Sequence, residues 1–492
     1  MARFPPLALA SIAVLALGFA SARAGDEPVR LVLEAKDIPA PHVEWYGIYM
    51  NGTKSGYMRQ EFGRTGEGAA ATYFSDQKGR IQMVASGRRV AMDLSTREEF
   101  DATPPFGFRR ARSSEAQGAN AKLVEVTRTE TGIAATVTSG KDKHTFSKPA
   151  PDYTLADSLS VERWFQSPRT VGDKIVVRDF DKDTLEMDVE TTSVLSRKET
   201  VVAGVPTVWY EARQESEKDG DGGVARVDST GMVISIAFGG MFEGRLETEA
   251  QAKQIGYGAD LFVFGLAKID KPIGDAVQVT RLVLEVTGGS AGKLASGPGQ
   301  TVVRDERTGA VTLSLGAAFG ESEPAAESAV NDALAETVDY PTKSPQVVEL
   351  AAKAVGDAQT PKEKVARLIP FVRDYIRDEV RPEMVTVPEI IASKRGDCTE
   401  HALLFLTLAR AVGVPTRYVS GLMYMGDDAL SFGGHAWDEV LLDGRWLAVD
   451  ATWGEIGVDA THVTLERKGT RKKDADLLAQ FTFRLREVEP KR

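Results

Sequence analysis

Three residues near the C-terminal end of the chain have side chains that could carry out thiol chemistry together. Cys398 is the single cysteine among 492 residues, and His435 and Asp450 follow it within the stretch 395–453. A thiolate is a nucleophile, an imidazole can act as its base, and a carboxylate can orient that imidazole. The sequence therefore predicts a nucleophile, a base and an orienting group at these three positions.

The residues around Cys398 indicate the start of a helix. Asp397 is a favourable N-cap, the segment 402–412 is dense in Leu, Ala and Phe, and Gly413 and Pro415 are typical of a helix end. The helix should be buried on most sides, and the positive end of its dipole should favour the thiolate. The alternative is that the cysteine is only a small buried hydrophobe.

Two strands are expected to carry the other two residues. The segments 435–442 and 445–452 flank Asp443-Gly444, which is typical of a two-residue hairpin turn. In this register the pairs are Leu442 with Arg445, Trp437 with Asp450, and His435 with Thr452. His435 and Asp450 then project from one face as diagonal neighbours, roughly 7–8 Å apart at the backbone. If the helix of Cys398 packs on that face, the three groups converge.

Alternative interpretations exist for these residues and their neighbours. His401 could compete as the base, but we interpret it as structural or supporting, because a side chain one turn along the helix need not reach the sulfur. His435 could be a satisfied structural histidine, and Asp450 could anchor a turn. Tryptophans 437, 446 and 453 are interpreted as core or cleft wall, and Glu400 and Glu439 are expected on solvated faces.

Four segments of this stretch resemble the transglutaminase-like superfamily of papain-like cysteine enzymes. They read GDCTEHALLF, LARAVGVPTRYVSGL, GHAWDEV and GRWLAVDATW. The resemblance covers about the last third of the chain and implies Cys398 as nucleophile, His435 as its base and Asp450 as the orienting group. It also implies an α+β fold. Ala451 stands where the family commonly has proline, which leaves the triad intact.

The remaining chain indicates a multidomain protein, with N-terminal antiparallel β domains before the transglutaminase-like α+β domain. Alternating, β-branched segments with turn signals dominate up to residue 340, and capped amphipathic helices begin near Ser344. The predicted ranges are 1–24 for a signal peptide, 25–255 for a β-rich domain, 256–340 for a small β domain and linker, and 341–492 for the catalytic domain.

The N-terminus indicates export. A basic Met1–Arg3, an apolar run from Leu7 to Phe19 and the sequence Ala22-Arg23-Ala24 predict a signal peptide cleaved after Ala24. An uncleaved anchor is the alternative, although the run is short for a membrane span, and no other segment is long and uncharged enough. We therefore expect a secreted or periplasmic protein, in which a lone cysteine forms no intramolecular disulfide and is easier to understand as a used thiol.

Charge and motif content exclude several classes of function. The net charge is −11, and removing the signal peptide with its two arginines makes it more negative. An acidic chain without a basic stripe is a poor candidate for binding nucleic acid or anionic membranes. No metal-ligand, calcium-loop or phosphate-loop spacing is present, so we expect no metal and no cofactor.

The sequence thus predicts a secreted thiol acyl-transfer enzyme acting on peptide or side-chain amide bonds of a protein or peptide substrate. Hydrolysis by a peptidase or amidase and transamidation remain equally compatible with the motifs. A non-enzymatic envelope protein that binds proteins or peptides, with the C-terminal fold as scaffold, is the alternative. A redox sensor at Cys398 is a third reading, but it leaves His435 and Asp450 unexplained. The oligomeric state stays open.

Overall fold

The structure is a computed structural model of the full chain. It describes residues 28–491 except 30, 51, 86–87, 119, 183–184, 203–204, 217–219, 239–241, 258–265, 289–290, 292–293, 317–326, 380–384 and 469–480. The signal peptide expected at 1–24, with its cleavage site after Ala24, lies outside the described residues. Contacts divide the chain into two compact units that meet in sequence at Ala259 and Asp260.

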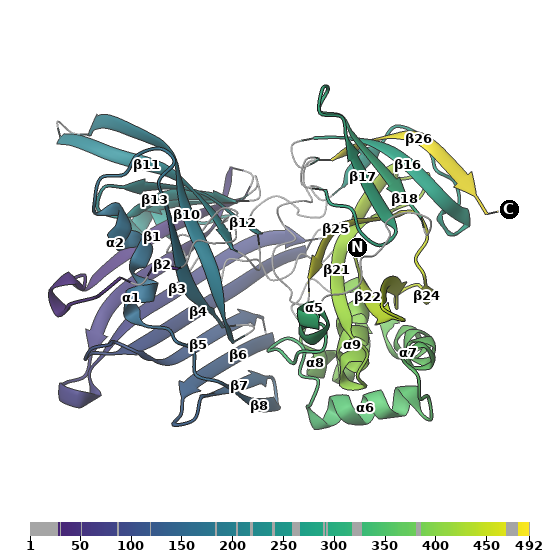
Figure 1. Ribbon diagram of the computed structural model, residues 1–492, viewed down its shortest axis with the longest axis horizontal. Helices are drawn as coiled ribbons and strands as arrows, with labels where there is room; N and C mark the ends of the chain where they lie inside the picture. The colour runs from purple at the N-terminus through teal and green to yellow at the C-terminus, as the bar shows by residue number, and fades with distance from the viewer. Residues whose placement is uncertain are drawn as a thin grey trace. The chain divides into compact units, whose positions relative to one another are not determined.

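The N-terminal unit is built on one large antiparallel sheet (Figure 1). Its strands are β1 His42–Met50, β2 Thr53–Thr65, β3 Thr72–Ala85, β4 Arg88–Asp101, β5 Phe108–Gln117, β6 Asn120–Arg128, β7 Ile133–Ser139, β8 Asp142–Lys148, β9 Lys174–Asp181, β10 Glu186–Val202, β11 Val205–Ser216, β12 Gly220–Asp228, β13 Val233–Phe238 and β14 Phe242–Glu247. The sheet order is β8-β7-β6-β5-β4-β3-β2-β1-β14-β13-β12-β11-β10-β9. Its described residues also form the short α-helices α1 Leu155–Ser158, α2 Ser160–Phe165 and α3 Glu249–Ala252.

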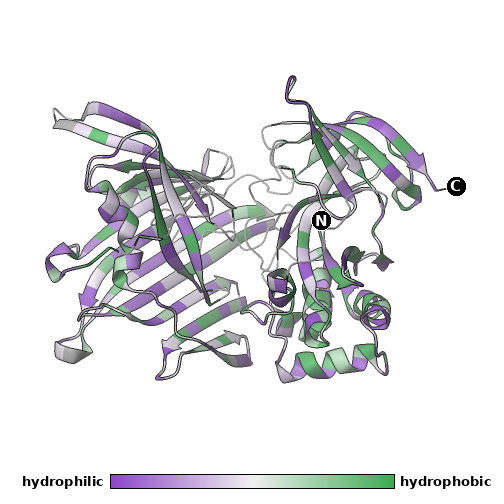
Figure 2. Ribbon diagram, in the orientation of Figure 1, coloured by the Kyte–Doolittle hydropathy of each residue, from purple (hydrophilic) through white to green (hydrophobic). Residues whose placement is uncertain are grey.

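The N-terminal sheet is curved (Figure 1). Hydrophobic and hydrophilic residues alternate along its strands in Figure 2, so one face of each strand can be buried. The ring of Phe108 on β5 lies 5.2 Å from that of Phe180 on β9, and Phe100 on β4 lies 5.6 Å from Tyr153. Strand β9, at one end of the sheet order, therefore faces β5, which lies close to the other end of that order, across an aromatic core.

The C-terminal unit combines a second sheet with a group of helices. Its strands are β15 Ala267–Ile269, β16 Val279–Thr287, β17 Gln300–Arg304, β18 Val311–Leu315, β21 Thr416–Tyr424, β22 Ser431–Leu442, β23 Arg445–Asp450, β24 Glu455–Ile456, β25 His462–Lys468 and β26 Thr482–Pro490, with β19 Arg377–Asp378 and β20 Arg395–Gly396 forming a separate pair. Its helices are α5 Glu327–Asp332, α6 Pro345–Val355, α7 Pro361–Tyr375, α8 Val387–Ser393 and α9 Cys398–Ala411. The main sheet order is β17-β18-β16-β26-β15-β22-β21-β25, with β23 and β24 added beside β22.

Local sequence signals explain the helix boundaries of this unit. Thr360 caps α7 by accepting the Glu363 backbone N–H at 3.2 Å, and the Glu363 carboxylate accepts the Thr360 N–H at 3.0 Å. Helix α6 begins with Pro345 at its first turn and ends at Gly356, whose φ is 57°. Helices α6, α7 and α8 pack around α9 in one apolar core, which holds α9 in place.

The expected fold class is confirmed: a large antiparallel N-terminal sheet precedes an α+β domain. The domain ranges remain a prediction. Strands β16 to β18, from the range 256–340, join the C-terminal sheet because β16 pairs with β26. Among the described residues, no helix combines the length and apolar content needed to cross a bilayer.

Candidate active site

Cys398 is the first residue of α9, as predicted. The Asp397 carboxylate accepts the Thr399 backbone N–H at 3.0 Å, and the Asp397 backbone N–H donates to the Glu400 carboxylate at 2.8 Å. The second bond belongs to a capping box between Asp397 and Glu400, and together these contacts satisfy backbone groups at the helix start. Because residues 398–410 of the helix are all buried, its first turn is held rigidly, and the thiol with it.

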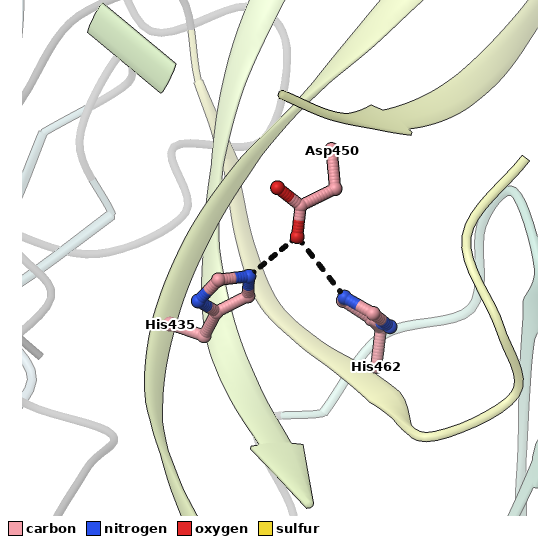
Figure 3. A group of neighbouring side chains, drawn as sticks. All are labelled: His435, Asp450 and His462. Carbon is pink, nitrogen blue, oxygen red and sulfur yellow. Dashed lines mark hydrogen bonds and ion pairs between the residues drawn. The ribbon is translucent and has the colours of Figure 1, made fainter. Parts of the chain in front are cut away.

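His435 and Asp450 lie on the two strands of the predicted hairpin. Leu442 pairs with Arg445, and the turn residues Asp443 and Gly444 have φ values of 50° and 77°. The His435 Nε2–H donates to the Asp450 Oδ2 at 2.6 Å (Figure 3). The diagonal neighbours predicted from the register are therefore in direct contact.

The Cys398 thiol meets the imidazole of His435 from the first turn of α9. A hydrogen bond and an electrostatic interaction join the two side chains. Nε2 is bonded to Asp450, so Nδ1 is the nitrogen left for the sulfur. All three predicted residues are thus brought together.

The body of the helix does not meet the condition that was stated for convergence, namely packing on the face of His435. Ala436 and Val440 belong to the apolar core that surrounds α9, and alternate residues of a strand share a face. The body of α9 therefore packs on the face of β22 opposite to His435. The three side chains meet because Cys398 is at the very start of α9. The body of α9 does not need to pack on the face of β22 that carries His435.

Charge distribution in the site favours an ionised His435. Burial opposes the imidazolium, but the Asp450 carboxylate and the charge on Cys398, with a hydrogen bond to each, raise the pKa of His435 to about 10. Burial likewise opposes the ionised form of Asp450, but the charges and hydrogen bonds of His435 and His462 hold the pKa of that carboxyl well below its ordinary value. The pair behaves as imidazolium and carboxylate.

Asp450 receives four contacts, and one of them involves a residue that the sequence analysis did not single out. Its Oδ1 accepts the backbone N–H groups of Thr452 at 2.7 Å and Trp453 at 3.4 Å. Its Oδ2 faces the Nε2 of His462 at 3.4 Å as well as that of His435 (Figure 3). His462 opens β25, which pairs with β21 and not with β23, so no local spacing could have indicated that it meets Asp450.

Trp437 packs against both imidazoles. Its ring centroid lies 5.9 Å from that of His435 in a stacked arrangement and 5.1 Å from that of His462 in an edge-on arrangement. The indole is only 1% exposed. The expectation of a wall or core residue holds for Trp437, which restricts the orientation of both rings.

Two acidic residues expected on solvated faces are in fact fully buried. Glu400 closes the capping box of α9. Glu439 forms ion pairs with Arg417, at 2.7 Å to Nε, and with Arg467, at 2.8 Å to Nε. For Glu439 the expectation was wrong because its two cations come from other strands, Arg417 from β21 and Arg467 from β25, and this direct pairing compensates the burial of the charge.

His401 lies away from the hydrogen bond between His435 and Asp450. Its Nδ1 is 2.8 Å from the carbonyl oxygen of Asp397, one helical turn earlier, and the residue is 1% exposed. This contact supports the structural role that we expected. Trp446 is buried under the Arg417 guanidinium, whereas Trp453, next to the site in sequence, is 57% exposed.

Two groups of described side chains have ligand atoms close enough together to consider a metal ion: His435, Asp450 and His462, and Glu455, Asp459 and His462. Zinc ligands in a tetrahedral site lie roughly 3.3 Å apart, because each sits about 2 Å from the ion. The 2.6 Å contact of His435 with Asp450 is too short for that arrangement. In the second group, Asp459 Oδ1 already accepts the N–H and O–H of Thr461 at 2.7 Å each.

Access to the sulfur is narrow. Cys398 retains 4% of its surface and His435 6%.

Part of the C-terminal unit is similar to known proteins. Residues 348–451 match the model of the transglutaminase-like superfamily. The Kyphoscoliosis peptidase of Mus musculus is 29% identical over 124 residues, which are 23% of this chain and 19% of that protein. The Kyphoscoliosis peptidase of Homo sapiens is 29% identical over 122 residues, 23% of this chain and 18% of that protein. The match thus spans less than a fifth of the length of these curated relatives.

Two solved structures share features with the chain at low similarity. A "Putative Cysteine Protease" from Cytophaga hutchinsonii aligns with 44% of this chain and 86% of its own, at 16% identity and a TM-score of 0.29. A "Putative Protease" from Parabacteroides distasonis aligns with 79% of this chain and 70% of its own, at 11% identity and a TM-score of 0.21. TM-scores of this size support no argument about function.

Proposed function

We propose that this chain, in which residues 348–451 belong to the transglutaminase-like superfamily, is a thiol enzyme that acts on peptide or side-chain amide bonds. One observation carries the proposal: the His435 imidazole lies between the Cys398 thiol and the Asp450 carboxylate, bonded to the latter at 2.6 Å. This is the relation of nucleophile, base and orienting group that thiol acyl transfer needs.

The reaction follows from the charges of the pair. The Cys398 thiolate attacks the amide carbonyl carbon, and its electron pair forms the C–S bond while the oxygen becomes negative. The backbone N–H at the start of α9 is suited to stabilise that oxygen, because the dipole favours negative charge there. His435 then gives its proton to the leaving nitrogen, the C–N bond breaks, and a thioester remains.

The second step decides between two outcomes. Water deprotonated by His435 attacks the thioester and releases an acid, or an amine attacks and forms a new amide; in both cases the sulfur leaves as thiolate. Both outcomes use the same three residues. We favour hydrolysis, and we propose that the protein acts after export, as its N-terminal sequence indicates.

The test compares wild type with the Cys398→Ala variant. Casein-derived peptides and a free lysine-containing amine are incubated with each, and products are identified by mass spectrometry. Wild type should cleave or deamidate peptides, or attach the amine, and C398A should do none of these while keeping the wild-type circular dichroism spectrum. Equal activity in both proteins rejects the proposal.

The burial of Cys398 favours a second candidate, a binding protein that uses this fold as a scaffold. Iodoacetamide discriminates between the two, because Cys398 is the single cysteine and labelling reports one site. Rapid alkylation near neutral pH supports the enzyme, and alkylation only at the rate of an ordinary thiol supports the scaffold.

A further inference from the structure

His462 is a buried histidine for which the thiol mechanism described above has no role. It is 5% exposed and opens β25. Its Nε2 lies 3.4 Å from Asp450 Oδ2, and its Nδ1 lies 3.3 Å from Asp459 Oδ1 (Figure 3 shows the first contact). Both ring nitrogens therefore face carboxylate oxygens.

A carboxylate can only accept hydrogen bonds, so each nitrogen that faces one needs a proton. Asp459 is held ionised: burial opposes its charge, but bonds from His462 and Thr461 lower its pKa. His462 can satisfy both carboxylates only as imidazolium. Once it loses a proton, it can donate to Asp450 or to Asp459, but not to both.

We propose that His462 is a positioning residue for the thiol site, which bridges Asp450 and Asp459 as a cation and thereby fixes the carboxylate that orients His435. The inference rests on the proposed function, because a positioning role presupposes the reaction at Cys398. The contacts that run from Cys398 through His435 to Asp450 then continue to two further residues, His462 and Asp459.

The surroundings of His462 support a bridging cation. The charged groups that face it are Asp450 from the end of β23, Asp459 from the loop before β25, Glu455 from β24 and His435 from β22. Its partner on β21 is the uncharged Met423, and Trp437 covers the ring edge-on. Burial opposes the charge, but bonds to Asp450 and Asp459 outweigh both burial and the repulsion from His435, and they raise the pKa of His462 to about 8.

This arrangement has a measurable consequence for His435. As pH rises through about 8, His462 becomes neutral and one of its two contacts is lost. The ring of His435, whose centroid lies 5.5 Å away, should sense that change well below its own titration. The 15N imidazole signals of His435 should therefore show a secondary inflection near pH 8.

The experiment records these signals on full-length protein with 15N-labelled histidine, and it measures alkylation of Cys398 by iodoacetamide at pH 7. In His462→Gln we expect the inflection to disappear and alkylation to slow roughly tenfold, because a hydrogen bond to a charged group is lost. His401→Gln is the matched control, since His401 is equally buried on α9 but does not contact Asp450. H401Q should keep the inflection.

A folded H462Q protein with an unchanged inflection and alkylation rate overturns the proposal. If H462Q does not fold, Asp459→Asn tests the same bridge, because removing that anion should move the inflection below pH 8. An inflection that stays in place in D459N overturns the proposal as well. Neither readout needs turnover, so failure of this inference is distinct from loss of the activity tested with C398A.

Discussion

The Nε2 of His435 donates to the Oδ2 of Asp450 across 2.6 Å, although fourteen residues and a hairpin turn separate them in the chain. Both side chains are nearly or fully buried, and neither strand could place its group without the register set at Asp443-Gly444. A short bond between ionised partners in a buried site resists reorientation, which is what a base beside a thiol requires.

Replacing Asp450 should disable catalysis without dismantling the hairpin. Asp450→Asn removes the negative charge and turns an amide N–H₂ or C=O toward His435, so the imidazolium loses its main stabilising charge. We expect kcat/KM to fall by roughly a thousandfold or more, measured on any peptide that wild type turns over.

Asp443→Asn is the control for D450N, because it removes a carboxylate from the same hairpin at a position with φ of 50°, where asparagine is well tolerated. D443N should retain wild-type kinetics. A D450N enzyme within threefold of wild type would mean that the carboxylate does not orient the base.

The raised pKa of His435 predicts how stability depends on alkaline pH. Its folded-state pKa of about 10 lies above the ordinary value of 6.5, so the folded protein binds the proton more tightly than the unfolded chain. This contribution is fully present below about pH 6.5 and is lost as pH rises through about 10. The free energy of unfolding, measured by urea titration, should therefore decline between these values.

His435→Gln should flatten that decline, because the group that titrates is gone. His462 contributes a smaller total loss of stability of the same sign, complete near pH 8, which should persist in the H435Q variant. Identical slopes for wild type and H435Q would contradict the assignment of the raised pKa to this residue.

Asp438 predicts a second pH effect, from the other face of β22. Its carboxyl is fully buried, and neither oxygen has a hydrogen-bond partner among the described residues. Burial, reinforced by Asp450 and Glu439, raises its pKa well above the ordinary value, with only partial relief from Arg410. The folded protein therefore binds the proton of Asp438 more tightly than the unfolded chain does. The stability that this gives is present at acid pH and is lost as pH rises from the ordinary carboxyl range through the raised pKa of Asp438.

Asp438→Asn keeps the shape of the neutral acid and cannot ionise. We expect it to match wild-type stability near pH 5, within about 1 kcal/mol, and to exceed it near pH 8. Urea unfolding at the two pH values measures both. A D438N protein that is less stable than wild type at pH 8 would show that the ionised carboxylate is stabilised in the fold.

Glu439 should be one of the most sensitive positions for stability. Glu439→Gln leaves Arg417 and Arg467, at 22% and 14% side-chain exposure, without the charge that both share. Removing one partner of a buried ion pair lowers the free energy of unfolding by about 3–5 kcal/mol, and here two cations depend on one carboxylate. Chemical denaturation measures the loss.

Glu489→Gln is a suitable comparison for E439Q, since Glu489 pairs with Arg281 between β26 and β16 of the same sheet and its side chain is 54% exposed. Exposed pairs contribute about 0–1 kcal/mol, so E489Q should change little. If E439Q lowers the free energy of unfolding no more than E489Q does, rearrangement in the variant makes up for the loss of the buried ion pairs.

Prediction from sequence succeeded where the physical cause is local. The N-cap at Asp397 and the hairpin at Asp443-Gly444 each depend on a few adjacent residues, and both are observed. The contact of His435 with Asp450 follows from that hairpin, because the register of a two-residue turn determines which side chains share a face.

Prediction failed where charges are neutralised by distant strands. Glu439 was expected in solvent, because nothing near it in the sequence indicates that Arg467 on β25 lies beside it. The face of β22 on which α9 packs could be stated only as a condition for convergence, since a buried helix carries no periodic pattern that marks the side on which its neighbours lie.

The sequence by itself determined a thiol at a helix start, an imidazole and a carboxylate on a hairpin, and an antiparallel β region before them, because caps, turns and alternation act over a few residues. Only the tertiary structure decided that the first turn of α9 reaches His435 while its body covers the opposite face, and that His462 joins Asp450. Those contacts join segments that are not adjacent in the sheet order. They are therefore determined by the packing of the whole C-terminal unit.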